Sequence, residues 1–119
     1  MKRVLIIDDS PFIAKEIADI VESKGYEVAG HAKNGESGIE MNDELNPDVI
    51  TLDIIMPGID GIETAQEILK RKPDAKIIML SSLCDHDTME EIEEIGLKYL
   101  VAKPIEPEKL LSALDEITA

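Results

Sequence analysis

The chain has little of what small extracellular domains use to hold themselves together. Of its 119 residues one is cysteine, Cys84, and the aromatic residues are two tyrosines, one phenylalanine and no tryptophan. A lone cysteine excludes an internal disulfide and is consistent with a reducing cytosol. With aromatic residues at 3% of the chain, we expect a hydrophobic core of aliphatic side chains and methionine.

Long apolar runs and an excess of positive charge are also missing. No stretch approaches the roughly 20 apolar residues of a membrane span, and the run that follows Met1-Lys2-Arg3 is too short for a signal peptide. The 12 Lys and Arg residues face 26 Asp and Glu residues, for a net charge of −14. This charge disfavours direct nucleic-acid binding and anionic membranes, and it favours a partner with a basic patch. We therefore expect a cytoplasmic protein that does not insert into a membrane.

What the chain does have is a regular alternation of two kinds of segment. Short runs rich in β-branched residues predict strands, and amphipathic stretches between capping residues and glycines predict helices. The expected strands are 4–7, 26–32, 48–53, 76–80 and 98–102; the expected helices are 11–24, a weaker segment between an Asn34-Gly35 turn and Asn46-Pro47, 61–72, 87–95 and one beginning at Glu106-Pro107. Alternation with short connections implies a parallel sheet with helices on both faces and right-handed crossovers. The length suits one doubly wound α/β domain spanning residues 1–119.

One strand carries an acid in an otherwise apolar run. Residues 49–58 contain a single charged side chain, Asp53, and the run stops at Pro57-Gly58. A segment this apolar and β-branched predicts a strand buried on both faces. Open α/β sheets bind ligands at the carboxyl ends of their strands, and we expect Asp53 to lie at that edge.

Three other predicted strands also end in reactive side chains. Asp8 and Asp9 follow the first strand, Ser81 ends the fourth, and Lys103 follows the fifth. Taken singly, each has an ordinary structural explanation as a helix-start acid, a turn hydroxyl or a strand-end lysine. Because the carboxyl ends of parallel strands share one edge, the sequence predicts that all of them gather around Asp53.

Three close carboxylates need a compensating cation. At about 4 Å and an effective dielectric of about 20, each pair repels by about 4 kcal/mol. Mg²⁺, with Mn²⁺ as an alternative, is a hard cation that takes carboxylates, waters and phosphate oxygens, and Lys103 adds a compact positive charge. A carboxylate beside a metal, an ammonium and a hydroxyl suits phosphoryl transfer, with Asp53 as the attacking group.

These motifs resemble the receiver domain of two-component response regulators, and most of all the stand-alone chemotaxis type. The resemblance rests on residues 4–10, 53–61, Ser81 and 100–104, and it extends over the whole chain. It implies a flavodoxin-like (βα)5 fold with five parallel strands in the order 2-1-3-4-5.

The resemblance assigns a role to each acid. Asp53 would take a phosphoryl group from the phosphohistidine of a histidine kinase. Asp8 and Asp9 would hold Mg²⁺, Asp9 more directly and Asp8 partly through water. Asp53 itself and the backbone carbonyl of Ile55 would be the further ligands.

It also assigns roles to the remaining site residues and to a surface. Ser81 would bond the phosphoryl group and swing toward it, Lys103 would pair with it, and the Lys103-Pro104 peptide would be cis. The fourth helix, fifth strand and fifth helix would form the docking surface for an output protein. Such a protein catalyses only its own phosphorylation and dephosphorylation, and we expect a monomer or a weak dimer.

The chain departs from the family pattern at three places. Leu100 stands where a switch aromatic is usual, with Tyr99 one residue earlier, and strand alternation would put the two on opposite faces. Ile55 and Leu83 lie two residues past Asp53 and Ser81, where polar side chains that orient the hydrolytic water are common. We therefore predict a long-lived phosphoryl group.

The segment 85–94 holds six acids and no lysine or arginine, and two interpretations of it remain open. It is either a solvated helix face or a surface for a basic partner groove. For Cys84 and His86 nearby, a surface loop is favoured over a metal site because too few further ligands are available.

Other functions are weighed against the receiver. The chain could be a phosphorelay intermediate, a receiver excised from a larger regulator, or a receiver that is never phosphorylated. A Mg²⁺-dependent phosphohydrolase with an aspartyl nucleophile would need an acid where Ile55 stands. A flavin-binding module would need a Ser/Thr/Gly-rich phosphate loop where Asp8-Asp9-Ser10-Pro11 stands.

Overall fold

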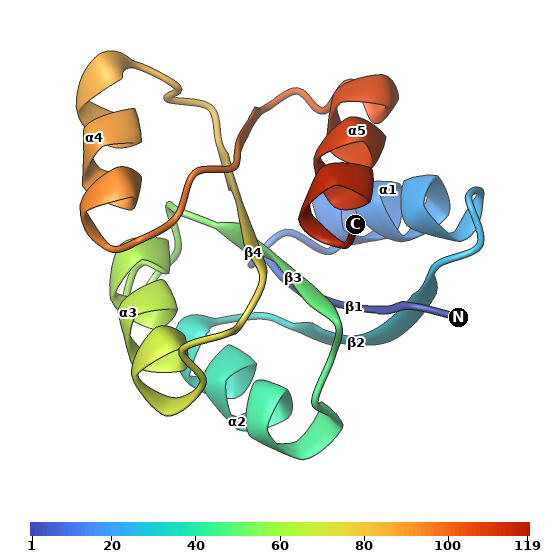
Figure 1. Cartoon of the computed structure of the whole chain (residues 1–119), viewed down its shortest axis with the longest axis horizontal. Coiled ribbons are helices and arrows are strands. Elements are labelled where there is room, and N and C mark those ends of the chain that lie inside the picture. The colour runs from blue at the N-terminus through green and yellow to red at the C-terminus, as the bar shows by residue number, and fades with distance from the viewer.

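The computed structural model describes residues 1–119 and contains a five-stranded sheet between two layers of helices (Figure 1). The strands are β1 (Arg3–Ile7), β2 (Glu27–Ala32), β3 (Val49–Asp53), β4 (Ile77–Ser81) and β5 (Leu100–Ala102); the helices are α1 (Pro11–Glu22), α2 (Gly35–Leu45), α3 (Gly61–Arg71), α4 (His86–Glu94) and α5 (Pro107–Ile117). The strand order is β2-β1-β3-β4-β5 and all neighbours are parallel. The predicted doubly wound fold and its strand order are confirmed.

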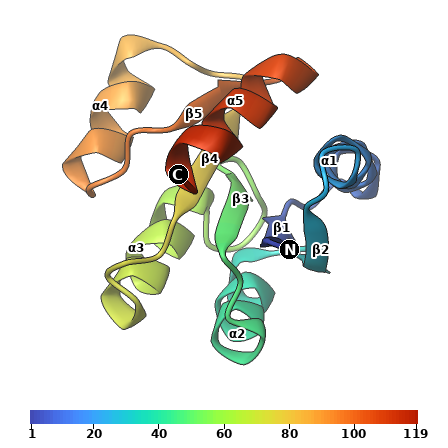
Figure 2. The same ribbon diagram turned by 45° about the vertical axis from the view of Figure 1, so that its right-hand side comes forward.

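Each face of the sheet buries its own aliphatic core. Helices α1 and α5 cover one face, and α2, α3 and α4 cover the other, as two views of the ribbon show (Figures 1 and 2). Along β1, Val4 and Ile6 pack into the first core whereas Leu5 and Ile7 pack into the second, because successive strand side chains point to opposite faces. The buried residues of the first core are Ile, Leu, Val and Ala, and those of the second are Ile, Leu, Ala and Met, as the low aromatic content predicted.

Four helices begin at side-chain caps close to the carboxyl edge of the sheet. The accepting side chains are those of Ser10, Asn34, Asp60 and Asp85, each of which takes a hydrogen bond from the backbone amide three residues later. These bonds satisfy amides that would otherwise lack a partner at a helix start. Asn34 was predicted to form a turn with Gly35; in the structure it caps α2, and Gly35 is the first helical residue.

Two glycines allow backbone segments to approach closely. A Cβ on Gly38 would lie 2.6 Å from Ile7 Cδ1, so α2 packs closely against the sheet at this point. A Cβ on Gly61 would collide with the backbone of Asp53 and Ile54. Any side chain at Gly61 would therefore push α3 away from the loop that follows Asp53.

The fifth strand and fourth helix differ in detail from the prediction. β5 has three residues instead of the predicted five, because this edge strand pairs with β4 only from Leu100 to Ala102. In α4 only Ile92 is fully buried; Met89 and the C-cap residue Ile95 are half-buried. No helix is both long enough and apolar enough to cross a membrane.

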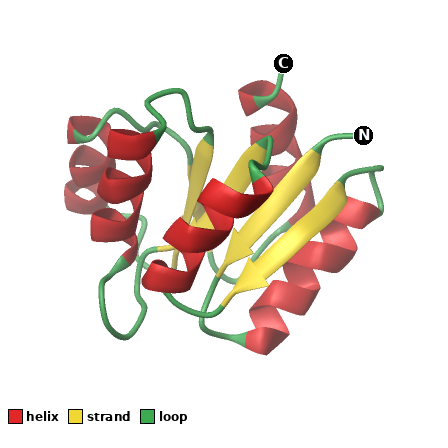
Figure 3. Cartoon of the chain, turned by 90° about the horizontal axis from the view of Figure 1, so that it is seen from below, coloured by secondary structure: helices red, strands yellow, loops and turns green.

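The two chain ends lie at the amino edge of the sheet, away from the arrowheads of the strands (Figure 3). Lys2 Nζ donates a hydrogen bond of 2.6 Å to the carbonyl of Thr118, which joins the two ends. The carboxyl edge, where the predicted site residues lie, is therefore remote from both termini.

Candidate functional site

Three carboxylates meet at the carboxyl edge of the sheet. Asp8 and Asp9 follow β1, Asp53 ends the adjacent β3, and one oxygen from each lies within 4.8 Å of the others. Asp8 is fully buried and Asp53 is 5% exposed, whereas Asp9 is exposed. The structure thus brings the three predicted acids together, with Asp9 on the side that solvent reaches.

Lys103 reaches two of the three acids from the loop between β5 and α5. Its Nζ lies 3.0 Å from Asp8 Oδ2 and 3.2 Å from Asp53 Oδ1, and its side chain is only 16% exposed. The Lys103-Pro104 peptide is cis, as the family resemblance implied. One ammonium therefore bridges two buried carboxylates that belong to different strands.

Asp53 and Lys103 both have shifted pKa values. Burial raises the pKa of Asp53 and the charge of Asp8 raises it further, while Lys103 and the amide of Ile55 lower it without reversing the shift. Burial by itself lowers the pKa of Lys103, but its hydrogen bond and ion pair with Asp8 and the charge of Asp53 outweigh this and leave the pKa raised. One ammonium among three carboxylates leaves excess negative charge at the edge. The donors are all carboxylate oxygens, which is the ligand chemistry that Mg²⁺ prefers.

Every polar group of Asp8 has a partner. Its amide donates to the carbonyl of Ala32 at 3.0 Å, and its Oδ1 accepts from the amide of Ser10 at 2.9 Å. Its Oδ2 accepts from Lys103, and its backbone carbonyl lies 2.9 Å from Nε2 of His31. Sequence reasoning missed His31 as part of this site, since periodicity places it on β2 without showing which neighbouring backbone its ring reaches.

Ser81 lies at the same edge as the acids. It ends β4, the strand next to β3, and it is 1% exposed. Its Oγ accepts a hydrogen bond of 2.9 Å from the amide of Leu83. The hydroxyl is therefore held by its own loop in this structure, and its contact with a phosphoryl group stays a prediction.

Comparison with known proteins agrees with this arrangement. A family model described as the response regulator receiver domain matches residues 4–115. The chain belongs to this family. The receiver domain is 41% identical over 117 residues to the chemotaxis protein CheY of Thermotoga maritima, and 35% identical over 116 residues to CheY of Listeria monocytogenes, with 98% of each chain covered in both comparisons. The predicted resemblance to the stand-alone chemotaxis type is confirmed.

A solved structure of the same fold supports this membership. A chain of the CheX-CheY-BeF₃-Mg complex from Borrelia burgdorferi matches the receiver domain with a TM-score of 0.94 at 31% identity. The match covers 99% of this chain and 90% of that one. Nearly every element of the receiver domain therefore has a counterpart in that structure.

The two residues around the expected switch position face opposite cores. Tyr99 packs against the core under α1 and α5, whereas Leu100 packs against the core under α2, α3 and α4. Their placement on opposite faces agrees with the predicted alternation, and both side chains are half-buried. Whether either residue acts as a switch stays a prediction.

Three exposed apolar side chains follow the strands at whose ends Asp8, Asp9, Asp53 and Ser81 lie. Apart from Met1, the exposed large hydrophobic residues are Phe12, Ile55 and Leu83, at 85%, 56% and 55% exposure. Phe12 lies in the first turn of α1, after Asp8 and Asp9, while Ile55 and Leu83 follow Asp53 and Ser81. We call these three residues the apolar rim. The outward position of Phe12 was not predicted; the helical period of the buried α1 residues was the signal that could have revealed it.

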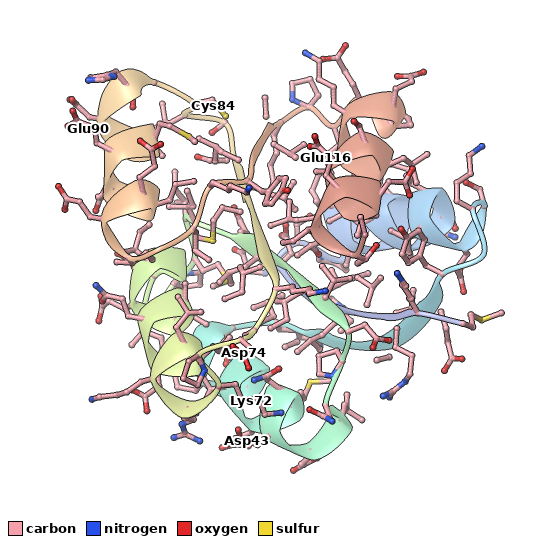
Figure 4. The ribbon with its side chains drawn as sticks, in the orientation of Figure 1. Asp43, Lys72, Asp74, Cys84, Glu90 and Glu116 are labelled. Carbon is pink, nitrogen blue, oxygen red and sulfur yellow. The ribbon has the colours of Figure 1, made fainter.

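The loop between β4 and α4 carries Cys84 and His86 on the surface of the receiver domain. Cys84 Sγ contacts the carbonyl of Ser81 at 3.3 Å, and His86 pairs with Glu90 at 2.9 Å. Figure 4 shows Cys84 in the loop above the gap between α4 and α5, and Glu90 on the outer side of α4. Neither residue belongs to a group of three close metal-ligating side chains, and only Asp8, Asp9 and Asp53 form such a group.

Proposed function

We propose that this protein is a phospho-accepting receiver of a two-component, chemotaxis-type signalling system. Asp53 takes a phosphoryl group from the phosphohistidine of a histidine kinase. The observation that carries the proposal is the placement of Asp53 at the sheet edge, 5% exposed, with Lys103 at 3.2 Å and the Asp8 and Asp9 carboxylates within 4.8 Å. An isolated buried acid would be costly, and this combination is the one that phosphoryl transfer requires.

The acid cluster fits a divalent cation. Asp8, Asp9, Asp53 and the backbone carbonyl of Ile55 would hold Mg²⁺, or Mn²⁺ in its place. When bound, the ion neutralises charge on the phosphoryl oxygens. The BeF₃ and Mg named for the related Borrelia burgdorferi complex support testing both on this chain.

Side chains of this protein take part directly in the phosphoryl transfer. An oxygen of Asp53 attacks phosphorus in line, the bond between phosphorus and the donor histidine nitrogen breaks, and its electron pair stays on the imidazole. Lys103 pairs with the transferred group, and the hydroxyl of Ser81 leaves the amide of Leu83 to donate to a phosphoryl oxygen. Because Asp53 is both acceptor and part of the site, the protein catalyses its own phosphorylation and dephosphorylation and acts on no separate substrate.

The apolar rim suits the approach of the donor protein. Phe12, Ile55 and Leu83 expose apolar surface on the segments that follow β1, β3 and β4, at the edge of the sheet where Asp53 lies. Exposed apolar side chains gathered beside a polar site are typical of docking surfaces. We propose that the histidine kinase, or its phosphotransfer domain, covers this rim during transfer.

The output partner is proposed to bind the surface formed by α4, β5 and α5. A groove there is lined by residues that include Cys84, Tyr99, Lys109 and Glu116. The acidic side chains of segment 85–94, in α4 and just before it, are all exposed. This charge favours a partner with a basic docking surface, whose binding weakens as salt is added. Binding that is insensitive to salt would contradict the electrostatic part of this proposal.

Intact mass measurement tests the phosphoacceptor directly. The protein is incubated with acetyl phosphate and Mg²⁺, and we expect the addition of one phosphoryl group. Asp53→Asn should abolish the addition. Asp74→Asn, a change of an exposed acid in the loop after α3, should leave it intact. An unmodified wild-type protein that also shows no NMR change with beryllofluoride and Mg²⁺ would overturn the proposed function.

A further inference from the structure

The β1–β2 pairing is continued past the last strand residues by one side chain. β1 ends at Ile7, which pairs with Ala32, and the amide of Asp8 still donates to the carbonyl of Ala32 at 3.0 Å. The carbonyl of Asp8 has no backbone partner on β2, and Nε2 of the half-buried His31 lies 2.9 Å from it. His31 thus supplies the next bond of the ladder after the strand backbones have separated.

The chemistry of this contact determines which ring nitrogen of His31 carries the hydrogen. A backbone carbonyl only accepts hydrogen bonds, so His31 Nε2 must carry the proton and donate it. The neutral ring therefore has its hydrogen on Nε2. Together the two bonds from β2 hold Asp8 on both sides of its Cα.

The hydrogen bond from His31 also affects Asp9, because the carbonyl of Asp8 belongs to the peptide that joins Asp8 to Asp9. That peptide is planar, and holding its oxygen sets the direction in which the chain enters Asp9. The carboxylates of Asp8 and Asp53 are held by Lys103, and that of Asp8 also by the amide of Ser10. The carboxylate of Asp9 has no hydrogen bond or ion pair to any other residue, so its position in the acid cluster depends on its backbone.

We propose that His31 is a positioning residue of the cation site: by donating from Nε2 to the Asp8 carbonyl, it orients the Asp8-Asp9 peptide and thereby aims the Asp9 carboxylate at the metal. The inference rests on the proposed function, because it assumes a cation held by the three acids. Groups that orient metal ligands commonly change metal affinity about 10- to 100-fold when they are removed.

Isothermal titration of the metal-free protein with Mg²⁺ tests the proposal. His31→Leu removes the donor and should weaken Mg²⁺ binding about 10-fold or more. His31→Gln places an amide N–H near the same point and should recover most of the affinity. His86→Leu removes the other histidine, which lies exposed on α4, and should bind Mg²⁺ like the wild type.

The outcomes separate this inference from the proposed function. A wild-type protein that does not bind Mg²⁺ would overturn the function itself. If the wild type binds Mg²⁺ and a folded His31→Leu variant binds it with equal affinity, only the proposed role of His31 is overturned. If His31→Leu does not fold, NMR of the ring nitrogens of His31 in the wild-type protein provides the test. We expect a proton on Nε2 with and without Mg²⁺. A neutral ring protonated on Nδ1 would overturn the proposal.

Discussion

The ammonium of Lys103 lies 3.2 Å from a carboxylate oxygen of Asp53, although their strands are separated in the sheet by β4. The same ammonium also reaches Asp8 at 3.0 Å. A single cation thus offsets part of the repulsion between two buried carboxylates, and the acid of Asp9 adds to the excess negative charge. The stability of the metal-free protein therefore depends on the charge balance at this edge.

Removing the charge of Asp53 should stabilise the metal-free protein. The pKa of Asp53 is raised by burial and by Asp8, so the folded state binds this proton more tightly than the unfolded chain does. Stability contributed by the protonated group is present below about pH 3.9 and is lost as the pH rises through the raised pKa. We expect Asp53→Asn to raise the free energy of unfolding at pH 7 by about 1–2 kcal/mol, a typical size for a single substitution.

Urea denaturation in EDTA across a pH series measures this effect. The difference between Asp53→Asn and the wild type should vanish as the pH falls below about 3.9, where the wild-type carboxyl becomes protonated in both the folded and the unfolded state. Addition of Mg²⁺ at pH 7 should stabilise the wild type more than the variant. A variant less stable than the wild type at pH 7 in EDTA would show that ionised Asp53 is not a destabilising charge.

Removing the ammonium should have the opposite effect. Lys103→Met leaves Asp8 and Asp53 without their counter-charge and should lower the free energy of unfolding of the metal-free protein at pH 7. Loss of one partner of a buried ion pair costs about 3–5 kcal/mol, and partial exposure of Lys103 reduces our expectation to about 1–3 kcal/mol. Urea denaturation with and without Mg²⁺ is the measurement, and Mg²⁺ should restore part of the loss. Lys109→Met, which breaks an exposed pair with Glu106, is the control and should change little.

A polar side chain at Ile55 should shorten the life of the phosphoryl group. Ile55 is 56% exposed two residues after Asp53, where an apolar side chain cannot orient a hydrolytic water. We expect Ile55→Asn to speed phosphate release about tenfold, equivalent to about 1.4 kcal/mol in the barrier. Phosphate release from the phosphorylated protein is followed after excess acetyl phosphate has been removed. Ile59→Asn is unsuitable as a control because Ile59 packs against the core. An unchanged lifetime would contradict the predicted role of this apolar position.

Truncating Phe12 should separate the two routes of phosphorylation. Phe12 is 85% exposed at the start of α1, and the proposed donor would bury it. Loss of a large aromatic contact at an interface costs about 1–2 kcal/mol or more, so Phe12→Ser should slow transfer from a phosphohistidine donor about tenfold. Phosphorylation by acetyl phosphate, which needs no docking surface, should be unchanged. Glu16→Ser, an exposed change on the same helix, should affect neither route; equal slowing of both routes by Phe12→Ser would place its effect at the site and not at docking.

Much of this protein follows from the sequence alone. Strand and helix periods, together with caps such as Ser10 and Asp60, determine the order of elements, because they report local burial and backbone hydrogen bonding. Their strict alternation leads to a parallel sheet, and a parallel sheet gathers strand-end residues at one edge. Asp8, Asp9 and Asp53 could therefore be expected together before any coordinates were known, and the structure places them within 4.8 Å.

Other features were decided only by the tertiary structure. The reach of His31 to the Asp8 carbonyl and the bond of Ser81 to the Leu83 amide have no local sequence signal. Each depends on strand register and on which neighbour a side chain meets across the sheet or loop. The shortening of β5 has the same cause, because the length of an edge strand is set by the partner strand with which it pairs. The sequence therefore determined which chemistry could assemble, and the packing of the strands decided which groups orient it.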